Sequence, residues 1–113
     1  MNCIHVPTRR CLAQEVETAH TFFARLRGLM GRRELPQGAA LLLEPCPQIH
    51  TCFMRFSIDV IFLDAQDRVV AVEENIKPWR MSKFYRSARR TLELPGGSLQ
   101  GLVKAGDELF FNL

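Results

Sequence analysis

The chain has 113 residues, of which 47% are hydrophobic and 24% charged, and it carries a formal net charge of +3. This composition excludes a disordered or collagen-like protein, and the length predicts a single domain, residues 1–113, with one buried core. No apolar run approaches the roughly 18 residues that a membrane-spanning helix needs, so we expect no membrane association.

The N-terminal residues 1–10 lack the apolar stretch and small-residue cleavage site of a secretory signal. We therefore predict a cytoplasmic location. In that reducing compartment the cysteines are expected to be thiols that pack as small hydrophobic side chains.

In the first half of the chain, residues 3–6 and 11–18 are predicted strands on either side of a turn at 7–10. Residues 21–31 form the clearest predicted helix, because Thr21 suits an N-cap, apolar residues recur at helical spacing, and Gly31 suits the end. After a turn at 35–38, the wholly apolar run 39–43 predicts a buried strand.

In the second half, β-branched and aromatic runs predict strands at 49–54, 58–63 and 68–76, with a hairpin turn at 64–67. Residues 78–90 show no periodic pattern and are predicted to form a loop. Strands follow at 91–94 and 108–111, and Ser98 caps a short predicted helix that ends at residue 103. The fold class predicted is α+β and mostly β: a small sandwich or barrel-like β domain with one principal helix packed on it.

Sequence blocks distributed over residues 18–113 follow one another in a specific order. They are RLRGLMGR at 25–32, HTCFMRFSIDVIFLD at 50–64, NIKPWR at 75–80, LELPGG at 92–97 and VKAGD at 103–107. Together they resemble the bacterial and archaeal family called domain of unknown function 192, although Phe53, Ser57 and Gly96 stand where its pattern leads us to expect glycine, proline and alanine. The resemblance implies a compact, mostly β domain and implies no established activity, substrate or cofactor.

The segment from His50 to Asp59 holds the best candidate site. If 49–54 is a strand, His50, Cys52 and Met54 share one face, because side chains alternate along a strand. Asp59 lies among apolar residues, where a carboxylate is costly unless it has a partner. One hypothesis has Asp59 orienting His50 or Arg55 in a pocket; the alternative has it accepting backbone or arginine hydrogen bonds that hold two strands together.

The cysteines and histidines offer soft metal ligands at two places, Cys46-x3-His50-x-Cys52 and the N-terminal group of Cys3, His5 and Cys11. Neither follows the C-x2-C spacing of structural zinc sites. The alternative is a set of core cysteines and hydrogen-bonded histidines, and we predict no metal site and no cofactor.

The segment 77–90 is the strongest electrostatic feature. It contains no acidic residue, has the aromatic residues Trp79, Phe84 and Tyr85, and carries six cations: Lys77, Arg80, Lys83, Arg86, Arg89 and Arg90. A second basic cluster comprises Arg25, Arg27, Arg32 and Arg33. The segment is a solvated loop, an anion or nucleic-acid contact, or a protein interface, and Glu73, Glu74 and Glu93 are candidates to neutralise it.

These observations lead to a hypothesis of a non-catalytic binding or accessory module. Its face for a small ligand or a protein partner is formed by His50, Arg55, Asp59, Trp79 and Arg80. The alternatives are a small hydrolase or transferase that uses His50 and Asp59, and a nucleic-acid or anion-binding protein that uses the basic loop 77–90. Oligomeric state is left open by the sequence.

Overall fold

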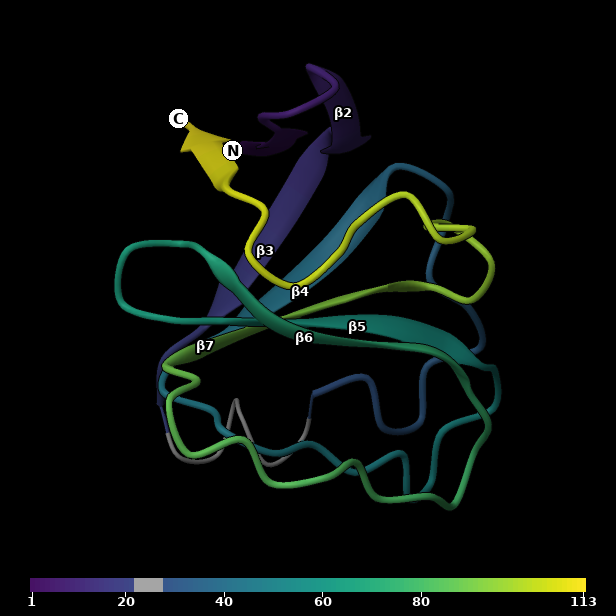
Figure 1. Cartoon of the computed structure of the whole chain (residues 1–113). Coiled ribbons are helices and arrows are strands. Elements are labelled where there is room, and N and C mark those ends of the chain that lie inside the picture. The colour runs from purple at the N-terminus through teal and green to yellow at the C-terminus, as the bar shows by residue number, and fades with distance from the viewer. Residues whose placement is uncertain (22–27) are drawn as a thin grey trace.

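A computed structural model describes residues 1–21 and 28–113 as eight strands in two sheets (Figure 1). The strands are β1 (Asn2–His5), β2 (Arg10–Ala13), β3 (Glu15–Ala19), β4 (Ala39–Leu43), β5 (Ile58–Leu63), β6 (Val69–Ile76), β7 (Arg90–Pro95) and β8 (Leu109–Asn112). The smaller sheet has the strand order β2-β1-β8 and the larger has the order β3-β4-β7-β5-β6. Only β3 and β4 pair in parallel within the described residues; the other neighbouring strands are antiparallel.

Most of the predicted strands are confirmed. β4 and β5 occupy 39–43 and 58–63 as predicted, and β6, β7 and β8 differ from their predicted bounds by a single residue at one or both ends. The predicted strand 11–18 is divided into β2 and β3 at Gln14. The backbone N–H groups of Gln14 and Glu15 both donate to the carbonyl of Gly38, which bends the chain from one sheet into the other.

The predicted α+β class with one principal helix is wrong, because the described residues form strands, turns and loops and contain no helix. Most of the predicted helix at 21–31, residues 22–27, lies outside the described part of the chain. Its described C-terminal portion, residues 28–31, is a turn in which Gly28 and Gly31 have φ values of 47° and 76°. Such left-handed backbone is incompatible with a continuing α-helix.

The short helix predicted from Ser98 to residue 103 is also wrong. Residues 96–101 form consecutive turns and bends, with left-handed φ values at Gly97 (83°), Gln100 (45°) and Gly101 (77°). The Ser98 hydroxyl donates to the carbonyl of Pro95 instead of capping a helix. The N-cap signal therefore marked a turn, a context in which serine is equally favoured.

The strand predicted at 49–54 is wrong except for an isolated bridge between His50 and Met81. The N–H of Met54 donates to the carbonyl of Thr51 at 3.2 Å, which closes a turn, and Phe53 has a φ of 62°. The predicted shared face of His50, Cys52 and Met54 therefore does not exist.

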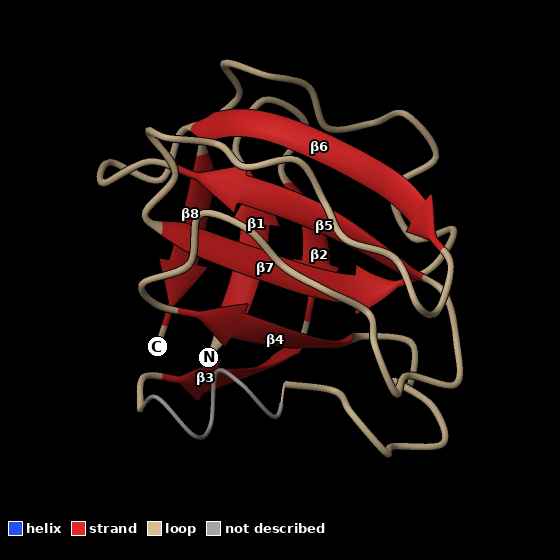
Figure 2. Ribbon diagram, turned by 90° about the horizontal axis from the view of Figure 1, so that it is seen from below, coloured by secondary structure: helices blue, strands red, loops and turns tan. Residues whose placement is uncertain are grey.

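The larger sheet is covered on both faces. On one face, Ile61, Leu63, Leu92 and Leu94 pack with residues of the smaller sheet such as Leu109. The other face, which includes Leu41, Leu43, Val60 and Phe62, is covered by irregular segments that supply Leu29, Leu35, Ile49, Met54 and Ala88. Figure 2 shows these segments crossing in front of the larger sheet, with the smaller sheet behind it. The loops with the predicted site residues belong to this loop-covered face.

Candidate binding surface

Two loops far apart in sequence are joined by hydrogen bonds over the larger sheet. Thr51 is fully buried between them. Its N–H donates to the carbonyl of Arg80 at 2.8 Å, its carbonyl accepts from the N–H of Trp79 at 3.0 Å, and its hydroxyl donates to the carbonyl of Lys77 at 2.6 Å. We call the face formed by residues 50–55 and 77–84 the two-loop surface.

Large apolar side chains are exposed on the two-loop surface. Phe53, Trp79 and Met81 are 60%, 58% and 69% exposed, and Phe84 is exposed as well. The rings of Phe53 and Trp79 contact each other, with centroids 4.6 Å apart and planes tilted by 59°. Both residues have left-handed backbone, with φ values of 62° and 64°. For a bulky residue this conformation is unusual and costs about 1–2 kcal/mol.

Four of the predicted site residues, His50, Arg55, Trp79 and Arg80, lie on the two-loop surface. His50 is half-buried, and its Nδ1 accepts a hydrogen bond from the N–H of Cys52 at 3.2 Å. Arg55 and Arg80 are exposed.

Asp59 is not part of this surface. It lies on β5 between Ile58 and Val60, which face the loops, so its own side chain points to the opposite face of the sheet. Its fully buried carboxylate accepts hydrogen bonds from the backbone N–H groups of Asn75 (2.8 Å), Gly97 (3.2 Å) and Leu99 (2.9 Å). These contacts fasten β6 and the 96–101 turns to β5, and they engage the Asp59 carboxylate with backbone groups instead of with His50.

The cations of segment 77–90 are largely uncompensated. Within the described residues, only Arg90 of this segment forms ion pairs, with Glu44 at 3.3 Å and with Asp67. Glu73 accepts hydrogen bonds from the Lys83 N–H (3.1 Å) and the Tyr85 hydroxyl (2.6 Å) instead of pairing with a cation. Burial, together with this bond to Glu73, raises the pKa of Tyr85 to about 12.

The other two acidic candidates for neutralising the segment are Glu74 and Glu93. Glu93 is buried. Glu74 accepts from the N–H of Gly101 at 3.0 Å. In the second basic cluster, Arg32 pairs with Glu17 at 3.0 Å, whereas Arg25 and Arg27 lie outside the described residues. Segment 77–90 therefore carries net positive charge on the surface.

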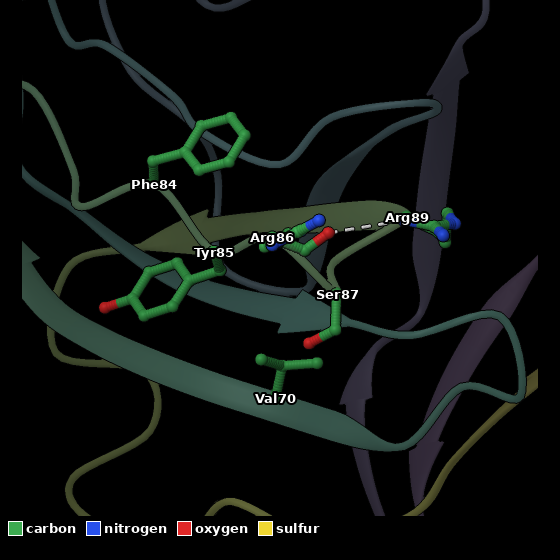
Figure 3. Close-up of a pocket in the computed structure, with 6 residues that line it drawn as sticks. All are labelled: Val70, Phe84, Tyr85, Arg86, Ser87 and Arg89. Atoms are coloured by element: carbon green, nitrogen blue, oxygen red, sulfur yellow. Dashed lines mark hydrogen bonds between the residues drawn. The ribbon is translucent and has the colours of Figure 1, made fainter.

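A hollow of about 510 Å³ lies where the basic segment passes over β6 (Figure 3). It is lined by Val70, Phe84, Tyr85, Arg86, Ser87 and Arg89. Figure 3 shows the side chain of Ser87 pointing toward Val70, the Tyr85 ring on the other side of Val70, and Arg89 pointing away.

Glu93, predicted from the sequence only as a candidate neutralising charge, is a buried carboxylate. It lies at the centre of the larger sheet, on β7, between Leu41 of β4 and Val60 of β5. Glu93 is 3% exposed, and its Oε1 accepts no hydrogen bond from the described residues. Burial raises the pKa of Glu93 to about 8, although the charge of Arg32 acts in the opposite direction. An acidic residue inside the apolar LELP run was the signal that could have revealed it.

A second buried polar group joins the two ends of the smaller sheet. The imidazole of His5 contacts the Thr8 hydroxyl at 2.7 Å through Nδ1 and the carboxylate of Asp107 at 2.8 Å through Nε2. The hydrogen bond from His5, followed by that from the Lys104 N–H, lowers the pKa of Asp107. Nothing in the sequence signalled this group, because His5 and Asp107 are brought together only by the pairing of β1 with β8.

The described residues hold no group of three His, Cys, Asp or Glu side chains placed to bind a metal ion. All four cysteines are thiols, and burial raises the pKa of Cys3 to about 12. Nor does any helix in the described ranges have the length and apolar character needed to cross a membrane.

A family model and several relatives match the sequence of this chain. The family model DUF192, described as "Uncharacterized ACR", matches residues 4–111. The chain belongs to this family. The DUF192 resemblance noted in the sequence is thereby confirmed.

Relatives within the family are similarly described. The chain is 36% identical to the UPF0127 protein PF1050 of Pyrococcus furiosus, over 87% of each chain. It is 41% identical to the UPF0127 protein PH1112 of Pyrococcus horikoshii, over 84% of this chain and 85% of that protein. No catalytic role is attached to the family by these names.

Two crystal structures share the fold. One is a putative transcription regulator from Sinorhizobium meliloti, with a TM-score of 0.79, 23% identity, and coverage of 96% of this chain and 89% of that one. The other is a protein of unknown function from Novosphingobium aromaticivorans, with a TM-score of 0.77, 24% identity, and coverage of 85% and 74%. At these identities the likeness extends to the fold alone.

Proposed function

We propose that this DUF192 protein is a non-catalytic binding module and that its two-loop surface binds an acidic segment of a partner protein with an apolar anchor side chain. The observation that carries the proposal is the pair of exposed aromatic residues, Phe53 and Trp79, held in contact in left-handed backbone. Contiguous exposed apolar side chains rimmed by polar residues are typical of interaction sites.

The aromatic pair is supported by a rigid backbone. The buried Thr51 fixes the loop of Trp79 through its backbone and hydroxyl hydrogen bonds, so the two loops hold their relative position without a partner. A surface that is already ordered loses little conformational freedom on binding, which favours affinity. Strained conformations persist where the surrounding structure enforces them, and they cluster at functional sites.

The positive charge of the two-loop surface indicates that the partner segment is acidic. Lys77, Arg80 and Arg55 lie on the two-loop surface and form no ion pair with the described residues. Aromatic residues, methionine and arginine are enriched at protein interfaces, and tryptophan and arginine are frequent among the side chains that dominate binding energy. A carboxylate-rich segment with one aromatic or aliphatic residue complements both the cations and the aromatic pair.

The geometry of the aromatic pair favours a protein over nucleic acid. The two rings are tilted by 59° against each other and cover part of each other's surface. Single-stranded nucleic acid is bound by aromatic faces open for stacking with successive bases.

The cytoplasmic location belongs to the same proposal, since four cysteine thiols suit a reducing compartment.

A displayed random-peptide library tests the proposal. Selection on the wild-type chain, with depletion on the double variant Phe53→Gly and Trp79→Gly, should enrich acidic peptides that contain an aromatic or aliphatic residue. The glycine variant removes both rings at positions whose φ suits glycine, so we expect it to fold. The enriched peptides should bind the variant at least about tenfold more weakly, as expected for loss of a dominant contact.

The matched control is Phe110→Ser, because Phe110 is 55% exposed on β8 of the other sheet. This substitution should leave peptide affinity unchanged. Equal enrichment on the wild type and the glycine variant would contradict the proposal. The proposal would also be contradicted if oligothymidylate bound the wild type tightly and competed with the enriched peptides. That result would show that the surface binds nucleic acid.

A further inference from the structure

We infer that the hollow between β6 and residues 84–89 is a second binding site, which adjoins the partner surface at Phe84, for a small phosphomonoester with an aromatic body. Its volume of about 510 Å³ lies within the range of small-molecule sites. The inference rests on three features of this hollow: a fixed frame, donors for an anion that have no partner among the described residues, and apolar side chains in its lining.

The frame is a turn pinned to the protein core at both ends. The Tyr85 N–H donates to the carbonyl of Pro47 at 2.9 Å, and the Arg89 N–H donates to the carbonyl of Leu63 at 2.7 Å. Between them, the Ala88 N–H donates to the carbonyl of Tyr85 at 3.0 Å and closes the turn. The chain between Tyr85 and Arg89 is thus held in place before any ligand arrives.

The two central residues of this turn, Arg86 and Ser87, supply the donors. Neither their backbone N–H groups nor the Ser87 hydroxyl have a hydrogen-bond acceptor among the described residues, and the Arg86 guanidinium has no ion-pair partner there. Guanidinium, hydroxyl and backbone N–H groups are the donors that bind phosphate oxygens. No acidic residue lines the hollow to compete with an anion.

The apolar wall is formed by Tyr85 and Val70. The Tyr85 ring packs on the buried Phe62, with centroids 4.4 Å apart, and its hydroxyl is held by Glu73. The ring therefore keeps its orientation. Figure 3 shows the Tyr85 ring and the Ser87 side chain on either side of Val70 in this view. A phosphate held at Arg86 and Ser87 brings an attached aromatic group against this wall, where stacking and apolar contact stabilise it.

Amide NMR spectra of the full chain test the inference, with phenyl phosphate as the probe. Phenyl phosphate should shift the amide signals of residues 84–89 and Val70, whereas phenol and inorganic phosphate should bind at least about tenfold more weakly, each lacking one half of the contacts. Adenosine monophosphate should compete with phenyl phosphate for the same residues.

Two variants make the test specific. Arg86→Gln should weaken phenyl phosphate binding by about tenfold or more, and Ser87→Ala should weaken it by a smaller factor. The matched control is Arg33→Gln, because Arg33 is an exposed arginine outside the hollow and should have no effect. Shifts scattered over the surface, unchanged affinity in Arg86→Gln, or equal affinity for inorganic phosphate would each overturn the inference. The glycine variant at positions 53 and 79 should bind phenyl phosphate normally, which separates this site from the proposed partner surface.

Discussion

Glu93→Gln should change how the stability of the protein depends on pH. In the folded chain Glu93 has a pKa of about 8, against an ordinary value of 4.5, because it is buried at the centre of the larger sheet. Between these values the folded chain binds one proton more than the unfolded chain. The free energy of unfolding should therefore fall as pH rises, by about 1.4 kcal/mol for each pH unit.

The total effect follows from the width of the window. The stabilising protonation is fully present below the ordinary pKa of 4.5 and is lost as pH rises through about 8. Across this window the loss amounts to about 5 kcal/mol, a large part of the stability of an ordinary domain. A glutamine side chain has nearly the same volume as glutamate and does not ionise, so the substitution removes this slope.

Urea unfolding of wild type and Glu93→Gln over the range from mildly acidic to mildly alkaline pH measures the difference directly. Other titrating groups are shared by both proteins and cancel. The variant should gain stability relative to wild type steadily as pH increases, whereas the exposed control Glu34→Gln should follow wild type throughout. Parallel curves for wild type and Glu93→Gln would refute the reasoning, since they would show that Glu93 titrates alike in the folded and unfolded chains.

Three other substitutions have defined outcomes. Asp59→Asn replaces one acceptor oxygen with a donor and leaves a buried backbone N–H unpaired, so thermal unfolding should show a loss of about 1–3 kcal/mol. Asp107→Asn should lower the free energy of unfolding by about 1.5–3 kcal/mol at neutral pH. Because the hydrogen bond from His5 lowers the pKa of Asp107, the stability difference between wild type and variant should disappear as pH falls through that lowered pKa. A difference that stays constant with pH would contradict the role given to the His5–Asp107 contact. Gly96→Ala places a Cβ 2.9 Å from the carbonyl oxygen of Ser57, so the free energy of unfolding measured in urea should fall by about 1–3 kcal/mol. An unchanged unfolding midpoint would show that the backbone shifts to accommodate the methyl group and would contradict this prediction.

The strands could be predicted where burial on both faces produced a continuous apolar run. β4 is such a run, β5 is one apart from Asp59, and the bounds of both strands match the prediction. The segment 49–54 has similar residue types, yet it is an irregular loop because Thr51 makes its hydrogen bonds with residues 77–80, more than twenty positions away. Local pattern cannot report such partners. The same limit explains the helix predicted at 98–103, where Asp59 holds the backbone of Gly97 and Leu99 in turns.

The candidate site was only partly accessible from sequence. The basic segment indicated cationic side chains on a loop, whereas Trp79 could equally have been a buried core residue; in the structure both Trp79 and Arg80 are exposed. His50 and Arg55 lie on the same surface as Trp79 because a bridge between His50 and Met81 joins the two loops. This pairing cannot be predicted from the spacing of residues in the sequence. Alternation along β5 places Asp59 on the opposite face from Ile58 and Val60, but both faces of this strand are buried, and only the tertiary structure shows that the loops cover the face of Ile58 and Val60.

The pairing of β1 with β8 has a consequence for the order in which the chain folds. Asn2 pairs with Asn112 and His5 with Leu109, so the smaller sheet is completed by strands from opposite ends of the described sequence. Closing so long a loop is entropically costly, whereas the hairpin of β5 and β6 needs only a short turn. We therefore expect the hairpin of β5 and β6 to form first and β1, β2 and β8 to dock later on the apolar face of the larger sheet. Amides of the smaller sheet should exchange with solvent before those of β5 and β7, as expected for the part of the fold that forms last and opens first.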